Sequence, residues 1–215
     1  MPIDYSKARR LLARRDPVLR DLIRRHGPCG LADRQHADPF IALTHAIMSQ
    51  QLSTKAAATI FGRFLALFPE GETLSAAAIA RMDDAALRGV GLSGQKVGYL
   101  RDLSSRILDG RLQLDELDRL ADEVVIERLT SVKGFGRWTA EMFLMFRLHR
   151  PDVLPTGDLG IVKAVQRLYR LRKTPDPKRL LKIGDAWRPY RSVACWYLWQ
   201  TLQMEALPPI KPKAR

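Results

Sequence analysis

The sequence predicts an all-α protein. Apolar residues recur with the 3.6-residue period of a helix in almost every segment, and no run of alternating β-branched residues indicates a strand. The 215 residues suffice for one sizeable domain or for two small subdomains that share a core. Neither a low-complexity tract nor a long linker marks a domain boundary. We therefore expect one helical unit.

Capping residues, proline and glycine delimit the helices of the first half. Asp16 and Pro17 predict a helix start, and Gly27 ends that helix. Ser53 is typical of a helix cap, and Pro69 stops the helix that it opens. The helices expected in this half cover residues 17–26, 39–50, 54–68, 75–81 and 83–88, and a segment through 97–107 that ends at Gly110.

The second half continues the same pattern. A break is expected at residues 174–177, Thr-Pro-Asp-Pro, and the tail over 206–215 should be extended and mobile. The helices expected here cover residues 115–120, 122–130, the segment after the glycines at 134 and 136, 158 to about 172, a short helix to about 187, and 190 to about 204.

The charge favours a nucleic-acid partner. Lys and Arg number 36 against 23 Asp and Glu, which gives a net charge of +13. The basic residues are spread over the whole chain, which argues against a membrane surface. Cys29 and Cys195 alone cannot build a disulfide framework or an iron–sulfur cluster. With no signal peptide or apolar span, we expect a cytoplasmic protein.

The stretch from Leu129 to Ile161 carries the strongest functional signal. The glycines of Val132–Gly136 allow a tight turn, and the helix that follows leaves amide groups unpaired, which attracts a phosphate. A Gly-x-Gly turn is equally consistent with a plain helix connection, but the basic flanks Lys133 and Arg137 favour DNA. Asp158 opens the next helix, where the helix dipole favours its ionised form. Taken alone, it is most simply a cap.

Four segments together resemble the helix-hairpin-helix glycosylase superfamily, and within it 3-methyladenine DNA glycosylase II. They are SQQLS (49–53), LTSVKGFGRWTAE (129–141), LPTGDLGI (154–161) and WRPYRSVACWYLW (187–199), and the likeness covers roughly residues 39–200. The resemblance implies a two-lobed helical fold with a cleft between the lobes, without the β-rich domain of the best-known type. One lobe would span about 39–150, with the hairpin element at about 122–149, and the other about 1–38 and 151–205.

The resemblance also implies a role for each motif. Asp158 would be the essential acid. Four aromatic residues would line the base pocket: Trp199, Trp138, Trp196 and Tyr197. Without the resemblance they would be read as core residues, as most aromatic residues in helices are. The junction between two early helices would enter the duplex, with Gln51 as the wedge and Leu52 and Gln50 as the other candidates for that role. Without the resemblance, the polar amides there could equally be helix caps. DNA phosphates would bind at Lys133, Gly134, Gly136, Arg137, Thr139, Gly94 and Lys96. The backbone carbonyls of Thr130, Val132 and Phe135 would hold Na⁺ or K⁺.

The expected reaction is hydrolytic removal of a damaged base. Related bifunctional enzymes carry a lysine nucleophile where this chain has Trp138, so no lyase activity is expected. A base alkylated at a ring nitrogen is already cationic and needs little acid assistance to leave. The implied enzyme is a monomeric, monofunctional glycosylase of bacterial or archaeal type that excises alkylated purines, chiefly 3-methyladenine, from double-stranded DNA, without an organic cofactor. The alternatives are a non-catalytic DNA-binding module and a glycosylase for another damaged or mismatched base.

Overall fold

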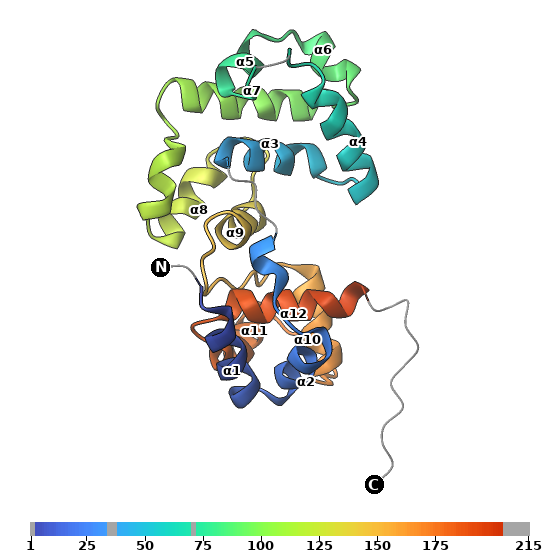
Figure 1. Ribbon diagram of the computed structural model, residues 1–215, viewed down its shortest axis with the longest axis vertical. Coiled ribbons are helices and arrows are strands. Elements are labelled where there is room, and N and C mark those ends of the chain that lie inside the picture. The colour runs from blue at the N-terminus through green and yellow to red at the C-terminus, as the bar shows by residue number, and fades with distance from the viewer. Residues whose placement is uncertain (1–2, 34–37, 70–71, 204–215) are drawn as a thin grey trace. The chain divides into compact units, whose positions relative to one another are not determined.

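The protein is all-α, as the sequence predicts (Figure 1). The computed structural model describes residues 3–33, 38–69 and 72–203, and these contain no β-strand. None of their helices is long and apolar enough to cross a membrane. The tail expected to be mobile, residues 206–215, lies outside the described residues.

Residue contacts divide the chain into two compact units. The split unit comprises the described residues up to 33 together with those from 149 on, and the continuous unit comprises the described residues in between. The expected boundary between the two lobes was at about residue 150, whereas the split unit resumes at His149. Two local features accompany this difference. His149 adopts a left-handed backbone with a φ of 50°, and the Arg150 carbonyl accepts a hydrogen bond of 2.6 Å from Ser192 Oγ. His149 and Arg150 therefore belong to the split unit.

In the split unit, α12 is the central helix and packs against α1, α2 and α10 (Figure 1). A helix that is apolar on all sides is stable only when other helices surround it. Val193, Ala194, Cys195 and Leu198 of α12 are completely buried. The elements of this unit are α1 (Tyr5–Arg15), α2 (Pro17–His26), η1 (Gly30–Asp33), α10 (Leu159–Leu168), α11 (Pro177–Gly184), η3 (Asp185–Trp187) and α12 (Arg191–Gln203).

A buried carboxylate links the two chain segments of the split unit. Asp16 caps α2 as predicted, with Oδ1 accepting from the amides of Val18 at 2.8 Å and Leu19 at 3.1 Å. Its Oδ2 accepts from the Tyr169 hydroxyl and, at 2.8 Å, from Trp187 Nε1. Asp16 is 4% exposed, and the hydrogen bonds from these four donors offset the free-energy cost of removing the carboxylate from water. Trp187 is thereby a core residue.

Two tyrosines of this unit predict a loss of stability in alkali. Burial, and then the hydrogen bond to Asp16, raises the pKa of Tyr169 well above 10.0, and burial raises the pKa of Tyr197 to about 12. The folded protein therefore keeps both protons where the unfolded chain releases them. We expect the free energy of unfolding to fall between pH 10 and pH 12, because the unfolded state binds fewer protons there.

Urea unfolding at several pH values measures this effect. Tyr169→Phe should make the pH dependence shallower by about one proton, equivalent to about 1.4 kcal/mol per pH unit. Unfolding of both proteins at pH 7 to 8 is the internal control, because tyrosine with a pKa of about 10 or above keeps its proton there in both states. Equal slopes in wild type and Tyr169→Phe would contradict the prediction.

The continuous unit is built around α7, which packs against α3, α5 and α6 (Figure 1). Helix α3 also contacts α4 and α9, and α9 pairs with α8. Ser53 caps α4 as predicted, accepting from the Ala56 amide at 3.3 Å. The elements of this unit are α3 (Pro39–Ser49), α4 (Thr54–Leu65), α5 (Ala76–Arg81), α6 (Asp84–Gly89), α7 (Gly94–Leu108), η2 (Leu114–Arg119), α8 (Asp122–Thr130) and α9 (Arg137–Phe146).

The largest boundary error concerns α10, which ends at Leu168 and not at about Arg172. Arg170 adopts a left-handed φ of 52°. The amide of Leu171 donates to the Gln166 carbonyl at 2.9 Å, and that of Arg170 to the Arg167 carbonyl at 3.2 Å. These are the two hydrogen bonds of a Schellman motif. Arginine occupies the position where glycine is usual, so the sequence did not signal this helix end.

Candidate active site

Asp158 is held in one orientation by two hydrogen bonds to the same oxygen. Its Oδ1 accepts from the Ile161 amide at 2.8 Å, which makes it the cap of α10, and from Trp199 Nε1 at 3.1 Å. The residue is 9% exposed. The two sequence interpretations of Asp158, cap and functional acid, are therefore compatible, because the cap uses Oδ1 and fixes the direction of the carboxylate.

Gly160 permits the close approach of α12 to this carboxylate. A Cβ at this position would lie 2.7 Å from Leu202 Cδ1, 3.0 Å from Asp158 Oδ1 and 3.4 Å from Trp199 Cδ1. Only glycine fits without displacing one of these groups. Gly160 had no predicted role, since the contact with α12 that requires it is not visible in the sequence.

We expect Gly160→Ala to slow any reaction that depends on Asp158 by about 10-fold or more, because small displacements of a catalytic group are costly. The added methyl crowds Asp158 Oδ1 and the Trp199 ring. Single-turnover kinetics on the substrate proposed below measures the rate. Gly157→Ala is the packing control, since its Cβ would meet no atom within 4 Å, so its midpoint of urea unfolding should match wild type. A wild-type rate for Gly160→Ala would refute the claim.

The aromatic residues of α12 divide into two groups. Trp196 and Trp199 are partly exposed, and Trp199 contacts Asp158. Tyr197 is 0% exposed, and its hydroxyl donates to the Gly27 carbonyl at 2.8 Å. Tyr197 is therefore a core residue that packs towards α2, and its expected place in the base pocket is corrected. Trp138, the second residue of α9, is 50% exposed; it belongs to the continuous unit, so its place in a pocket with Trp199 stays a prediction.

In the continuous unit, α8 and α9 form the expected helix-hairpin-helix. The turn closes with a bond of 3.1 Å from the Phe135 amide to the Val132 carbonyl, and Gly134 has a φ of 85°. A Cβ on Gly134 would lie 2.2 Å from the ring of Tyr99, so both the backbone and the packing require glycine. The hairpin is thus fixed against α7.

The hairpin amides are used in two ways. The Lys133 amide donates to Asp102 Oδ2 at 2.9 Å and is therefore engaged within the protein. Burial raises the pKa of Asp102, but this amide and Arg106 outweigh burial and lower the pKa overall. Gly136, the cap of α9, makes no side-chain cap bond, and the positive end of a helix that begins in this way favours an anion. This end of α9 is the stronger candidate for the phosphate site.

Two of the three charged side chains expected at the phosphates, Arg137 and Lys96, are also engaged within the protein. Arg137 pairs with Glu123 at 2.6 Å and with the buried Glu141 at 3.1 Å. Lys96 donates to the carbonyls of Met48 and Gln50, at 2.8 Å each. Burial lowers the pKa of Lys96. The remaining expected phosphate contacts, Lys133, Gly134, Gly136, Thr139 and Gly94, are exposed or partly exposed. Phosphate binding by these residues stays a prediction.

Residues 49–52, from the last residue of α3 towards α4, are here called the junction. The three candidates for the wedge lie in it and differ in their surroundings. Gln50 Nε2 donates to the Gly134 carbonyl at 2.8 Å, so this side chain holds the hairpin. Gln51 is exposed and has a left-handed φ of 58°, which a non-glycine residue rarely adopts. Leu52 is 37% exposed. Gln51 and Leu52 thus form the exposed tip of the junction.

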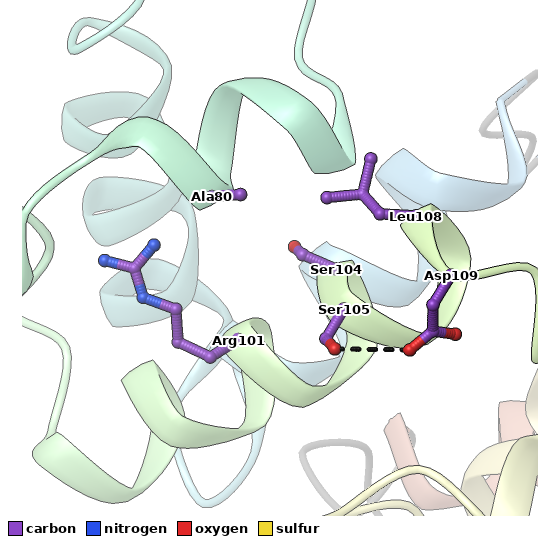
Figure 2. Close-up of a pocket in the computed structure, with 6 residues that line it drawn as sticks. All are labelled: Ala80, Arg101, Ser104, Ser105, Leu108 and Asp109. Carbon is purple, nitrogen blue, oxygen red and sulfur yellow. Dashed lines mark hydrogen bonds between the residues drawn. The ribbon is translucent and has the colours of Figure 1, made fainter.

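A hollow of about 580 Å³ lies elsewhere in the continuous unit, between α5 and α7 (Figure 2). The Arg101 guanidinium on its wall donates to the Ile79 carbonyl at 2.6 Å and pairs with Asp84 at 2.8 Å. None of the predicted site residues lines this hollow: Ala80, Arg101, Ser104, Ser105, Leu108 and Asp109 form its wall. It is therefore not part of the candidate site. Among the described residues, no cluster of His, Cys, Asp or Glu could hold a metal ion.

An all-α chain with a glycine hairpin, an amide-lined helix start and an oriented carboxylate defines a protein of the helix-hairpin-helix class. The chain belongs to the HhH-GPD superfamily of base excision DNA repair proteins, whose family model matches residues 44–189. It is 39% identical over 178 residues to DNA-3-methyladenine glycosylase 1 of Schizosaccharomyces pombe, covering 82% of this chain and 78% of that protein.

Two solved structures have the same fold. The 3-methyladenine DNA glycosylase Mag1 of S. pombe, solved in complex with abasic DNA, superposes with a TM-score of 0.81 at 35% identity over 94% of this chain and 100% of that one. A DNA-3-methyladenine glycosidase of Bacillus halodurans gives a TM-score of 0.72 at 37% identity over 89% of this chain and 91% of that one. The predicted fold and superfamily are thereby confirmed.

Proposed function

We propose that this protein is a DNA glycosylase that binds double-stranded DNA and hydrolyses the N-glycosidic bond of alkylated purines, chiefly 3-methyladenine. The observation that carries the proposal is Asp158, which is held by the Ile161 amide and Trp199 Nε1 in a chain of the HhH-GPD superfamily. The names of its relatives in S. pombe and B. halodurans support the substrate class.

The proposed reaction begins with rotation of the damaged nucleotide out of the duplex, because its glycosidic bond is inaccessible inside the stack. The exposed tip of the junction, Gln51 and Leu52, fills the gap, while the amides that open α9 hold a backbone phosphate. The Trp199 face attracts a cationic alkylated base, with Trp196 of the same helix as a further wall. Each of these groups acts on a different part of the nucleotide.

Base loss leaves positive charge on the sugar, and Asp158 is proposed to stabilise it electrostatically or to activate the attacking water. Because the Ile161 amide and Trp199 Nε1 both donate to Oδ1, the carboxylate is oriented before substrate arrives. Trp138 cannot form a Schiff base, so the product is an abasic site in an uncut strand. One chain supplies the hairpin, the acid and the aromatic walls, and we propose that it acts as a monomer on chromosomal DNA, in a cytoplasm of bacterial or archaeal type.

A monovalent cation is proposed at the hairpin. The carbonyl of Thr130, the last residue of α8, belongs to the group of terminal carbonyls that lack a helical donor. The Val132 carbonyl accepts one bond, from the Phe135 amide, and an oxygen of this kind has two lone pairs. Together with the Phe135 carbonyl they form a set of hard oxygen donors, which suits Na⁺ or K⁺. The cation would stabilise the turn; no organic cofactor or iron–sulfur cluster enters the proposed reaction.

The test is incubation of the protein with methylated duplex DNA, followed by chromatography of the released bases and a count of abasic sites. Free 3-methyladenine and an equal number of abasic sites are expected, with strand breaks only after alkali. Strand breaks without alkali would contradict the monofunctional reaction. Release of an uncharged oxidised or mismatched base in preference to 3-methyladenine would identify another lesion, and salt-sensitive DNA binding without release would identify a non-catalytic module.

A further inference from the structure

One face of α7 carries three residues, each three positions from the next, that contact the two DNA-facing elements of the continuous unit. Lys96 donates to the Gln50 carbonyl of the junction, the Tyr99 ring lies against Gly134, and Asp102 accepts from the Lys133 amide. Residues three apart lie side by side on a helix. The stretch of α7 from Lys96 to Asp102 therefore supports the junction and the hairpin together.

The Lys96 ammonium binds carbonyls at the C-terminal end of α3. The last carbonyls of α3 lack helical donors, and a cation is favoured near them because a helix C-terminus is negative. The Lys96 ammonium binds two carbonyls there, of Met48 and Gln50, on either side of Ser49, the last residue of α3. The next residue, Gln51, is held in a left-handed conformation at the exposed tip. The ammonium therefore fixes the direction in which the tip leaves α3.

Gln50 joins the same junction directly to the hairpin. Its backbone carbonyl accepts from Lys96, and its side-chain Nε2 donates to the Gly134 carbonyl. The chain thus has two connections between junction and hairpin, one direct and one through α7. A phosphate bound at the start of α9 would accordingly fix the position of Gln51 relative to the DNA backbone.

We infer that Lys96 is a positioning residue for base release: through the carbonyls of Met48 and Gln50 it holds the junction in register with the hairpin, so that its tip enters the duplex beside the bound phosphate. This inference rests on the proposed function. It replaces the expected direct contact between Lys96 and a DNA phosphate, because the ammonium is engaged with two carbonyls.

Three measurements on Lys96→Met test the inference. The first is affinity for a duplex with an abasic-site analogue and for the intact duplex. The second is the fluorescence of 2-aminopurine beside the abasic site, which rises when the neighbouring base unstacks. The third is single-turnover release of 3-methyladenine. We expect preference for the abasic duplex, the fluorescence change and the release rate to fall by about 10-fold, with affinity for intact DNA changed less than 2-fold.

Lys182→Met is the matched control, because Lys182 is an exposed lysine of α11 and the variant loses the same charge. It should retain the preference and the fluorescence change of wild type. Lys96→Arg, which keeps a cation able to bind two carbonyls, should restore at least half of the fluorescence change. Gln50→Ala should reproduce the loss, since it removes the direct connection.

Each other outcome overturns the inference. If Lys96 contacts a phosphate directly, Lys96→Met lowers the affinity for both duplexes equally. The slope of log affinity against log salt concentration then decreases by the amount expected for about one phosphate contact. If Lys96 only stabilises the fold, the midpoint of urea unfolding falls while the folded variant keeps the wild-type preference. Unchanged preference in an active protein refutes the positioning role alone, whereas absence of base release by wild type refutes the proposed function.

Discussion

Asp158→Asn is expected to lower the rate of base release by about 100-fold or more, because it removes the negative charge that the developing positive sugar requires. The asparagine Oδ1 can still accept from the Ile161 amide and from Trp199 Nε1, so the cap of α10 and the position of α12 should persist. Single-turnover chromatography of the released base measures the rate, and urea unfolding verifies that stability stays within about 1 kcal/mol.

Asp176→Asn is the control for this substitution. Asp176 caps α11 through a bond of 2.7 Å from the Arg179 amide, so the change in chemistry and in helix position is the same. Its rate should equal that of wild type. If Asp158→Asn released base as fast as wild type, the carboxylate would be a cap and nothing more, and the reaction would need another acid.

Gly134→Ala is expected to disrupt the hairpin and to lower the free energy of unfolding by about 3 kcal/mol. A left-handed backbone costs a non-glycine residue about 1–2 kcal/mol, and overpacking costs about 1–3 kcal/mol. Both apply here, because Gly134 has a φ of 85° and its Cβ would lie 2.2 Å from a ring atom of Tyr99. Rotation of the ring about its Cβ–Cγ bond would not remove the clash, because Cγ itself would lie 2.6 Å from the added Cβ. Urea unfolding gives the free energy, and affinity for intact duplex DNA should fall with it.

Gly136→Ala provides the comparison within the same turn. Gly136 has a φ of −100°, and no atom lies within 4 Å of its added Cβ. Its stability should differ from that of wild type by less than about 1 kcal/mol. Equal losses for the two alanine variants would show that the hairpin needs glycine for flexibility in general and not for the packing of Tyr99 at one position.

Local signals made much of the site predictable. Asp158 and Ser53 follow from capping chemistry, which depends on a few neighbouring residues, and both were placed correctly. The all-α fold follows from the period of the apolar residues alone. The hairpin could be read from its two glycines, although only the structure distinguishes Gly134, which packs on Tyr99, from Gly136, which meets no neighbour.

The remaining features depend on contacts between distant segments. Lys96 donates to two carbonyls and Asp102 accepts from one amide, and these partners lie 31 to 48 positions away in the chain. No sequence pattern links these pairs. Tyr197 was assigned to the pocket because aromatic residues cluster near it, yet its direction on α12 is set by Gly27, which is 170 positions away. Helix period identifies a buried face but does not identify which neighbour covers it.

The Asp16 network has a consequence for the order in which the protein folds. Its partners Tyr169 and Trp187 are 153 and 171 positions away in the chain, whereas the continuous unit is one uninterrupted stretch. During synthesis α3 to α9 emerge before α10 to α12 and can pack on one another, because their partners in the continuous unit are already present. Helices α1 and α2 must wait for α10 and α12. Asp158 therefore receives its bond from Trp199 Nε1 only when nearly the whole chain has left the ribosome, so a prematurely terminated chain would present the hairpin without the oriented acid.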